Sequence, residues 1–246
     1  MVAKRKTVGR RAAVPRLPPT RERILDEVER LIAVRGVNGF TLQDVIGPLR
    51  MRVPAIYKHY RNRDDVLVAL AGRFVSRLAG QFDPAETADP IAALRESLDR
   101  FVLFKLANPA YVRLALADFA TPGGGMEYVK RAAGGSFRDN FSSGPLAPMH
   151  RRLAAMLRAA AATGRVRRID PEDFYRIVKA TLLFRLVFPD DDLLVHAPSA
   201  RQVTAVQRWL WSLAERLLAA EEPDLIDRGR RTGCGPTGRT GQRVSR

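Results

Sequence analysis

Cysteine is nearly absent from this 246-residue chain, in which Cys234 is the only one. A single thiol allows no disulfide within the chain and no thiolate metal cluster, which fits a reducing compartment such as the cytoplasm. Long apolar runs are missing too, since none approaches the length of about 18 residues that a membrane span needs. The basic start of the chain is not followed by the apolar stretch of a secretory signal. We therefore expect a cytoplasmic protein without a membrane partner.

The sequence also lacks the patterns on which catalysis and cofactor binding depend. Its three histidines, His59, His150 and His196, are far apart and form no metal-ligand motif. No glycine-rich phosphate loop follows an expected strand, and the two serines before glycine at 142–144 are not in the context of a nucleophile elbow. We expect no enzyme, no metal and no cofactor.

Positive charge, +16 in total, is concentrated at the two ends of the chain. Residues 1–23 hold eight basic side chains and one acidic, residues 228–246 hold six arginines and no acidic side chain, and the long middle section carries only +3. Both ends are rich in glycine, proline and arginine without apolar periodicity, which predicts disordered basic tails at 1–19 and 223–246. Such tails either solubilise the chain or attract nucleic acid without sequence preference.

Helical periodicity runs through nearly all of the middle section and predicts an all-α fold. Apolar residues recur at steps of three and four from residue 24 to 32, which predicts a first helix that Gly36 ends. Thr41 followed three positions later by Asp44 forms a capping box for a second, short helix, which is expected to end near Arg50.

A third short helix is expected over residues 53–60, because Pro54 suits the first turn of a helix. Ile56 and Tyr60 lie one helical turn apart and are expected to face the core. Asn62 then caps a longer helix. Two short helices joined by a three-residue turn and braced on both sides are the layout of a helix-turn-helix DNA reader.

The charge of the turn and the third helix has one sign. Positions 50–63 hold five basic side chains and no acidic one. Tyr57 and His59 add a hydroxyl and an imidazole that can donate hydrogen bonds to phosphate oxygens. Packing explains Tyr60, whereas Tyr57 lies one position off the core-facing side and is better explained by an exposed role.

These residues can be compared with a known family. The runs TLQDVI at 41–46, IYKHY at 56–60 and RDDVL at 63–67 resemble the N-terminal domain of TetR-family transcriptional regulators. The match covers roughly residues 20–70. The turn departs from the family pattern, because Arg50 stands where glycine is usual and Arg52 where serine is usual. If the turn keeps a left-handed residue, Arg50 has to adopt a strained φ.

The resemblance implies a DNA-binding role for the matched positions. Thr41 would contact a phosphate, the start of the third helix would meet base edges, and the basic and aromatic residues behind it would hold the DNA backbone. Arg52 can pair with O6 and N7 of guanine, and each such pair discriminates between bases by about 1–3 kcal/mol. The predicted DNA-binding residues are Thr41, Gln43, Arg52, Val53, Pro54, Ala55, Tyr57, Lys58, His59 and Arg63.

A polar segment with two prolines, 83–90, opens a second helical region. We predict a helix-turn-helix domain at 20–66 and a larger helical domain at 67–222. Further helices are expected from about Ile91 to Leu106, Pro109 to Phe119, Pro148 to Ala162, Pro171 to Val187 and Ala200 to Ala220, the last with a capping box formed by Ser199 and Gln202. Residues 121–147 hold six glycines and are expected to be a mobile loop with one short helix.

The resemblance also implies that the larger domain binds a small, often apolar effector between its helices. It implies further that the last two helices pair with those of a second subunit in a homodimer. Candidate pocket residues are Phe101, Phe104, Tyr111, Phe119, Met149, Met156, Phe174, Leu182 and Arg185. Aromatic and methionine stripes at helical spacing are more often core than ligand wall, so packing is the competing interpretation.

Arg185 is a charge in an apolar stripe. At about 100° per residue it is placed between Phe174, Val178 and Leu182, in the middle of the apolar face. Because a buried guanidinium without a partner is costly, three interpretations stay open. Arg185 pairs with a carboxylate, for example from 190–192 across a dimer interface, or it contacts an anionic effector, or the helix has another register and exposes it.

The sequence thus predicts a ligand-responsive, DNA-binding transcriptional regulator. It would act as a repressor that binds a pseudo-palindromic operator as a homodimer and is released by a small-molecule effector. The alternative is a helical interaction or adaptor protein that binds nucleic acid through its basic tails, equally for all sequences.

Overall fold

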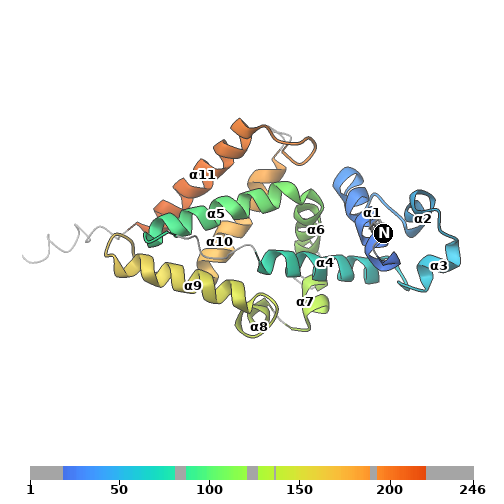
Figure 1. Cartoon of the computed structure of the whole chain (residues 1–246), viewed down its shortest axis with the longest axis horizontal. Coiled ribbons are helices and arrows are strands. Elements are labelled where there is room, and N and C mark those ends of the chain that lie inside the picture. Colours follow the sequence, from blue (N-terminus) through green and yellow to red (C-terminus); the bar gives the residue numbers. More distant parts are fainter. Residues whose placement is uncertain (1–18, 81–86, 121–126, 136, 189–192, 220–246) are drawn as a thin grey trace, which may run out of the picture.

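The computed structural model describes residues 19–80, 87–120, 127–135, 137–188 and 193–219. Within these ranges every regular element is an α-helix, from α1 to α11 along the chain (Figure 1). The all-α fold class is therefore confirmed for the described part of the chain. The two predicted basic tails, 1–19 and 223–246, lie outside the described residues apart from Pro19.

The first four helices form a head and the arm that leads out of it. They are α1 (Thr20–Arg35), α2 (Leu42–Leu49), α3 (Val53–Tyr57) and α4 (Arg63–Ala79). All four contribute to the apolar core, in which Ile24, Val28, Val45, Ile56 and Leu67 are buried, and this core continues into the larger part. In Figure 1 the helices α1 to α3 lie at one end of the molecule, and α4 runs from them into the larger part.

Seven helices make up the larger part. They are α5 (Pro90–Ala107), α6 (Pro109–Phe119), α7 (Glu127–Ala133), α8 (Phe137–Ser142), α9 (Ala147–Ala162), α10 (Pro171–Val187) and α11 (Ala200–Leu218). α5 contacts α9 and α11, and α10 contacts the same two helices. α6 and α7 both pack against α4, so that the arm is held on more than one side.

Helix starts follow the capping chemistry of the sequence. The side chain of Asp89 accepts a hydrogen bond from the backbone N–H of Ile91 at 3.0 Å, directly before the proline that opens α5. Asp170 does the same for the first turn of α10. Ser199 and Gln202 form the predicted capping box at the start of α11. These local signals explain why most of the predicted helices are confirmed within one or two residues.

Two predictions about helices were wrong. The third helix ends at Tyr57 and not at Tyr60, because Lys58 and His59 form a turn. The glycine-rich stretch 121–147 contains two short helices, α7 and α8, where one was expected. Among the described helices, none combines the length and the apolar character that a bilayer crossing requires.

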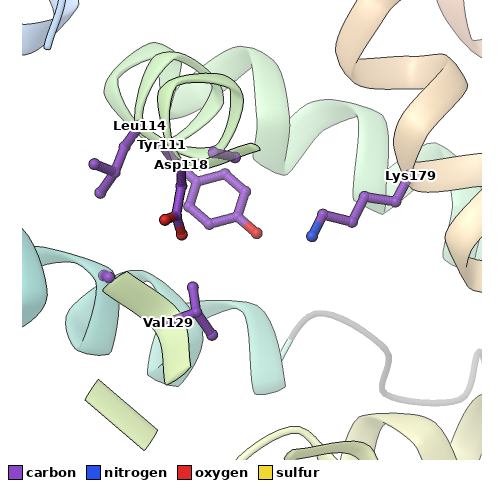
Figure 2. Close-up of a pocket in the computed structure, with 7 residues that line it drawn as sticks. Tyr111, Leu114, Asp118, Val129 and Lys179 are labelled. Atoms are coloured by element: carbon purple, nitrogen blue, oxygen red, sulfur yellow. The ribbon is translucent and has the colours of Figure 1, made fainter. Parts of the chain in front are cut away.

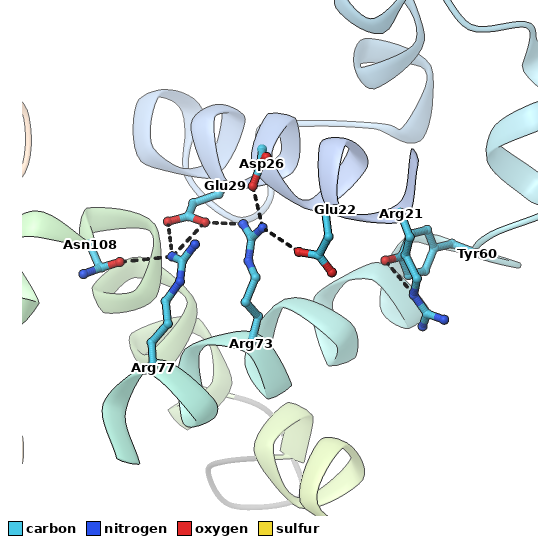
Figure 3. A network of polar contacts seen from close by, with 8 residues as sticks. All are labelled: Arg21, Glu22, Asp26, Glu29, Tyr60, Arg73, Arg77 and Asn108. Atoms are coloured by element: carbon cyan, nitrogen blue, oxygen red, sulfur yellow. Dashed lines mark hydrogen bonds and ion pairs between the residues drawn. The ribbon is translucent and has the colours of Figure 1, made fainter. Parts of the chain in front are cut away.

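α4 belongs to both parts of the molecule. The predicted domain boundary at 66–67 falls inside this continuous helix. Figure 3 shows how charged residues fix α1 on α4: Arg73 pairs with Glu22, Asp26 and Glu29 of α1. Arg77, one turn later, pairs with Glu29 at 3.0 Å and donates to Asn108 before α6 at 3.3 Å. The head is thereby attached to the larger part by side chains as well as by the chain itself.

Candidate functional site

The predicted capping box holds the first turn of α2, the first helix of the pair α2–α3. The carboxylate of Asp44 accepts hydrogen bonds from the backbone N–H and the hydroxyl of Thr41, each at 2.7 Å. These bonds favour the ionised carboxylate, and they lower the pKa of Asp44. Arg35 at the end of α1 adds an ion pair with Asp44 at 3.0 Å. The start of α2 is therefore fixed against α1.

The turn between α2 and α3 depends on one strained residue. Arg50 has φ 51° and ψ 41°, the left-handed conformation, and its N–H bonds to the carbonyls of Gly47 and Ile46. It is the only residue other than glycine with a positive φ in the described part of the chain. The expectation that Arg50 takes the place of the usual turn glycine at the cost of strain is confirmed.

Behind the turn, two residues anchor α3. Ile56 and Tyr60 are both buried, as expected from their spacing. The hydroxyl of Tyr60 accepts a hydrogen bond from Nε of Arg21 in α1 at 3.2 Å, and the guanidinium of Arg21 lies 5.0 Å from the centre of the Tyr60 ring. Because both anchors point inward, the residues between them point outward.

The exposed residues of α2, α3 and the turns beside them are largely basic or aromatic, and we call this set the reading face. It consists of the exposed residues Gln43, Arg50, Arg52, Val53, Pro54, Tyr57, Lys58, His59 and Arg61. Thr41 at the start of α2 is exposed beside it, and Ala55 is half-buried within α3. No acidic side chain occurs between positions 50 and 63, so phosphate groups would meet positive charge across this surface. Arg50 and Arg61 were counted only as charge in the sequence, and the structure shows that both are exposed.

Arg63 differs from the other predicted DNA contacts. Its Nη2 donates to the backbone carbonyl of Val37 and, at 3.2 Å, to the side chain of Asn38, while its guanidinium lies 5.0 Å from the ring centre of Phe40. These contacts fix the loop between α1 and α2 on the start of α4. Arg63 therefore supports the reading face from behind, and it is left out of that face.

The predicted effector-pocket residues divide into two groups. Seven of them are buried in the core: Phe101, Phe104, Tyr111, Met149, Met156, Phe174 and Leu182. The other two are not, since Phe119 is 46% exposed and Arg185 is half-buried. Of all nine, only Tyr111 lines the small cavity between α4, α6, α7 and α10 that is described below. Packing in the core therefore explains most of the residues that were predicted to line an effector pocket.

Arg185 does not lie in the middle of the buried side of α10. The buried residues of α10 are Phe174, Tyr175, Val178, Lys179, Leu182, Leu183 and Leu186, whose centre is about 70° away from Arg185 at 100° per residue. The expectation that Arg185 lies in the middle of the apolar face was therefore wrong, and Arg185 lies at the edge of the buried side. Residues 190–192, the expected carboxylate partners, lie outside the described residues.

Instead, two lysines are the buried basic side chains among the described residues of the larger part. Lys105 of α5 is 0% exposed and Lys179 of α10 is 3% exposed. Burial lowers the pKa of Lys179 to about 8. It lowers the pKa of Lys105 well below its ordinary value, and the positive charge of Lys179 lowers it further. Sequence reasoning missed both, although Lys105 stands in the apolar run FVLFKL at 101–106.

A small cavity adjoins Lys179. Its volume is about 10 Å³, and its walls are Ala71, Tyr111, Leu114, Ala115, Asp118, Val129 and Lys179, from α4, α6, α7 and α10 (Figure 2). Asp118 is buried and accepts a hydrogen bond from the backbone N–H of Tyr128 in α7 at 3.1 Å. Burial raises the pKa of Asp118, against the opposing effect of backbone N–H groups at the start of α7. No three His, Cys, Asp or Glu side chains gather as metal ligands in the described residues.

No protein-family model matches the sequence, and no curated protein does either. Several solved structures have a similar fold. A regulatory protein in the TetR family from Rhodococcus RHA1 is 17% identical, with a TM-score of 0.57 over 84% of this chain and 100% of that chain. GusR from Salmonella enterica is 20% identical, with a TM-score of 0.57 over 81% and 95%.

A third similar structure is PfmR from Thermus thermophilus, a TetR-family transcriptional regulator. It is 20% identical, with a TM-score of 0.53 over 79% of this chain and 97% of that chain. The chain described above therefore has the fold of TetR-family regulators, with the helix-turn-helix head and the larger helical part in the same order. At these sequence identities, the similarity shows a shared fold.

Proposed function

We propose that this chain is a ligand-responsive transcriptional regulator of the TetR family, which binds a pseudo-palindromic operator as a homodimer. In this proposal it represses transcription until a small-molecule effector binds to the larger part and releases the DNA. The reading face carries the proposal, because it combines an exposed helix-turn-helix, a positive charge without any acidic side chain, and exposed aromatic rings.

The roles within the reading face follow from chemistry. Arg52 stands directly before α3, where a side chain can reach base edges in the major groove. Lys58 and His59 follow the helix and are exposed, and Tyr57 is exposed at its end. These three carry donors suited to phosphate oxygens. Val53 and Pro54 offer only apolar contact, for example with a thymine methyl group.

The exposed side of α10 supports the homodimer. Ile177, Phe184 and Phe188 are exposed, and with Thr181 they follow steps of four, three and four along the helix. Phe184 and Phe188 are each 59% exposed, and large apolar side chains that gather on one side of a helix mark an interaction surface. A second copy of the chain could cover these side chains with its own α10. Steps of three and four residues are the spacing of side chains in a helix-helix interface.

Selection of duplexes from a random DNA pool tests the proposal. The full-length protein is expected to enrich one pseudo-palindromic sequence. On that sequence, Arg52→Ala should relax the preference at one position of each half-site and weaken discrimination there by about 1–3 kcal/mol. Lys58→Ala should weaken binding to all sequences and reduce the salt dependence by about one unit for each lost phosphate contact.

Two controls make the outcome decisive. Arg158 is exposed on α9, far from the reading face in the fold, and Arg158→Ala should change neither preference nor salt dependence. Deletion of 1–19 and 229–246 should lower non-specific binding and keep the selected preference. Equal binding of all duplexes, lost on tail deletion, would instead support the adaptor that binds nucleic acid through its tails.

A further inference from the structure

The surface of the larger part is hollowed where α9 ends and α10 begins. A groove of about 350 Å³ lies there, and six of its eight lining residues are apolar. Leu157, Ala161 and Ile169 are among them and are buried or half-buried. The other two lining residues are Arg158 of α9 and Arg168 of the loop before α10, and both are exposed. The groove therefore combines an apolar lining with two positive charges.

Arg158 and Arg168 differ from two other arginines of the loop that follows α9. Arg165 pairs with Asp89 before α5 at 2.9 Å, and Nε of Arg167 donates to a backbone carbonyl of α11 at 2.8 Å. The side chains of Arg158 and Arg168, in contrast, have no hydrogen bond or ion pair with any residue that the structure describes. No acidic residue is among the described residues that line the groove. A chain segment that complements the groove has acidic side chains beside apolar ones.

Helix α11 ends beside this groove. The backbone N–H of Arg167 donates to the carbonyl of Leu218 at 2.9 Å, and Arg168 is the next residue of the loop. Leu218 is the last residue of α11, and the structure describes the chain as far as residue 219. In Figure 1 the ends of α9 and α11 lie at the end of the molecule away from α2 and α3. The residues after 219 therefore follow from a point next to the groove.

The sequence after this point has the composition that complements the groove. Residues 221–227 read EEPDLID, with four acidic side chains, no basic one and two adjacent apolar residues, Leu225 and Ile226. Beyond them, positions 228–246 hold six arginines and no acidic residue. The acidic stretch is thus a short change of sign between α11 and the basic end of the chain.

The acidic segment is long enough to follow the groove. Seven residues reach at most about 23–25 Å. The stretch of α9 from Ala154 to Ala162 that lines the groove is about 12 Å long. A segment tethered next to its site is present there at an effective concentration of about millimolar, which favours it over a second copy at micromolar concentration.

We propose that residues 221–227 of the same chain occupy the groove between α9 and α10. Their acidic side chains pair with Arg158 and Arg168, and Leu225 and Ile226 cover the apolar lining. The segment then ties the end of α11 to the loop that follows α9. The interaction belongs to the larger part and does not depend on the function proposed above, and the deletion of 229–246 described there leaves the segment in place.

Disulfide formation in the full-length protein tests this contact. Cys234→Ser first removes the only thiol of the chain. With Leu225→Cys in the segment, Ala161→Cys in the groove should form a disulfide within one chain under mild oxidation. The matched control is Ala159→Cys, which is exposed on α9, outside the groove lining and about 160° around the helix from Ala161. We expect the groove pair to react at least about tenfold faster than the control pair, as measured by non-reducing electrophoresis and mass spectrometry.

Charge reversal tests the role of the two arginines. Arg158→Glu together with Arg168→Glu should reduce the rate of the groove pair to that of the control pair, because like charges then meet. Replacement of the four acidic residues of 221–227 by lysine in that protein should restore the fast reaction. Arg201→Glu, an exposed residue in the first turn of α11 and outside the groove lining, should leave the rate unchanged.

Three results would overturn the proposal. Equal rates for the groove pair and the control pair exclude the docking of 221–227 in the groove. A disulfide that joins two chains shows that a second copy supplies the segment. A groove-specific disulfide that survives the charge reversal excludes the pairing with Arg158 and Arg168. The comparison of the two cysteine pairs keeps both arginines, so it stands even if the charge-reversed protein fails to fold, and Ala162→Cys repeats it at an exposed lining position.

Discussion

Arg50 shows how one residue can support an interface at a cost in stability. Its left-handed conformation costs a residue with a Cβ about 1 kcal/mol or more, and glycine avoids this cost. We expect Arg50→Gly to raise the free energy of unfolding by about 0.5–1 kcal/mol relative to Arg50→Ala, since both variants lose the charge and only one keeps the strain. Urea unfolding at constant pH measures the difference. An alanine variant as stable as the glycine variant would show that the turn is not strained.

The two buried lysines lead to a second prediction, which concerns how the free energy of unfolding depends on pH. Lys179 has a pKa of about 8 in the folded chain, below the ordinary 10.5 that it regains on unfolding. Between these values the unfolded chain binds more protons than the folded one, so the free energy of unfolding should rise with pH. Lys105 acts in the same direction. Asp118, Tyr111 and Lys105 are among the groups near Lys179.

Urea unfolding at pH 7.5, 8.5 and 9.5 measures this slope, with at most about 1.4 kcal/mol per pH unit for each lysine. Higher pH is avoided, because the pKa of Tyr111 and of Tyr175 is raised by burial and their ionisation on unfolding acts in the opposite direction. Lys179→Met should reduce the slope, and Lys130→Met should not. Stability that is flat or falls over this range in the unaltered protein would mean that the lysines take up no proton on unfolding.

Lys105 and Lys179 are also buried residues that the sequence analysis did not predict. The sequence reasoning about a charge in an apolar stripe was sound and was applied to Arg185, which lies at the edge of the buried side. It applies to Lys105 and Lys179, which are buried. Which of several charged residues on a helix is buried depends on the neighbouring helices. The hydrophobic periodicity of one helix gives no information about where those neighbours lie. Tyr60 and Tyr57, in contrast, were placed correctly because their neighbour Ile56 fixes the register.

At the scale of elements, the bounds of a helix were predicted correctly where the sequence has strong signals for the start of that helix. The bounds Pro109–Phe119 and Pro171–Val187 agree with the structure at both ends, because a proline opens each helix and an Asn or Asp precedes it. α7 was not specified, since neither an apolar stripe nor a cap within its own sequence marks it. Its first turn is held by Asp118, a residue of another helix, and such a contact is invisible to local patterns.

The exposed side of α10 carries the third prediction. Phe184→Glu should place a charge in the proposed dimer interface and weaken dimerisation by about 2 kcal/mol or more, roughly thirtyfold in the dissociation constant. Light scattering at micromolar concentration measures the oligomeric state. Leu103→Glu is the matched control, because Leu103 is 47% exposed on α5 and should tolerate the charge without loss of the dimer. A dissociation constant that Phe184→Glu leaves unchanged, measured over a dilution series, would exclude this side of α10 as the interface.

At the scale of the molecule, the head and the larger part are joined by α4 and by the ion pairs of Arg73 and Arg77 with α1. This attachment leaves α2 and α3 at one end of the molecule and α10 in the larger part (Figure 1). A dimer through α10 therefore carries two heads at a distance set by the larger parts. The spacing of the two half-sites on DNA should reflect that distance and not the flexibility of a linker.

This geometry gives the last prediction. Two recognition helices that enter successive major grooves on one side of the duplex lie about 34–36 Å apart, one helical turn, or a multiple of it. Insertion of about five base pairs, half a helical turn, between the half-sites of the selected sequence turns them to opposite sides of the DNA. Affinity should then fall to that of a duplex with a single half-site, as measured by fluorescence anisotropy at constant salt, because one head of each dimer loses its site. Monomeric Phe184→Glu should bind the original and the expanded duplex equally, since it reads each half-site alone. If the unaltered protein is indifferent to the insertion, the two heads are not held at a fixed distance, and the rigid attachment through α4 is not what positions them.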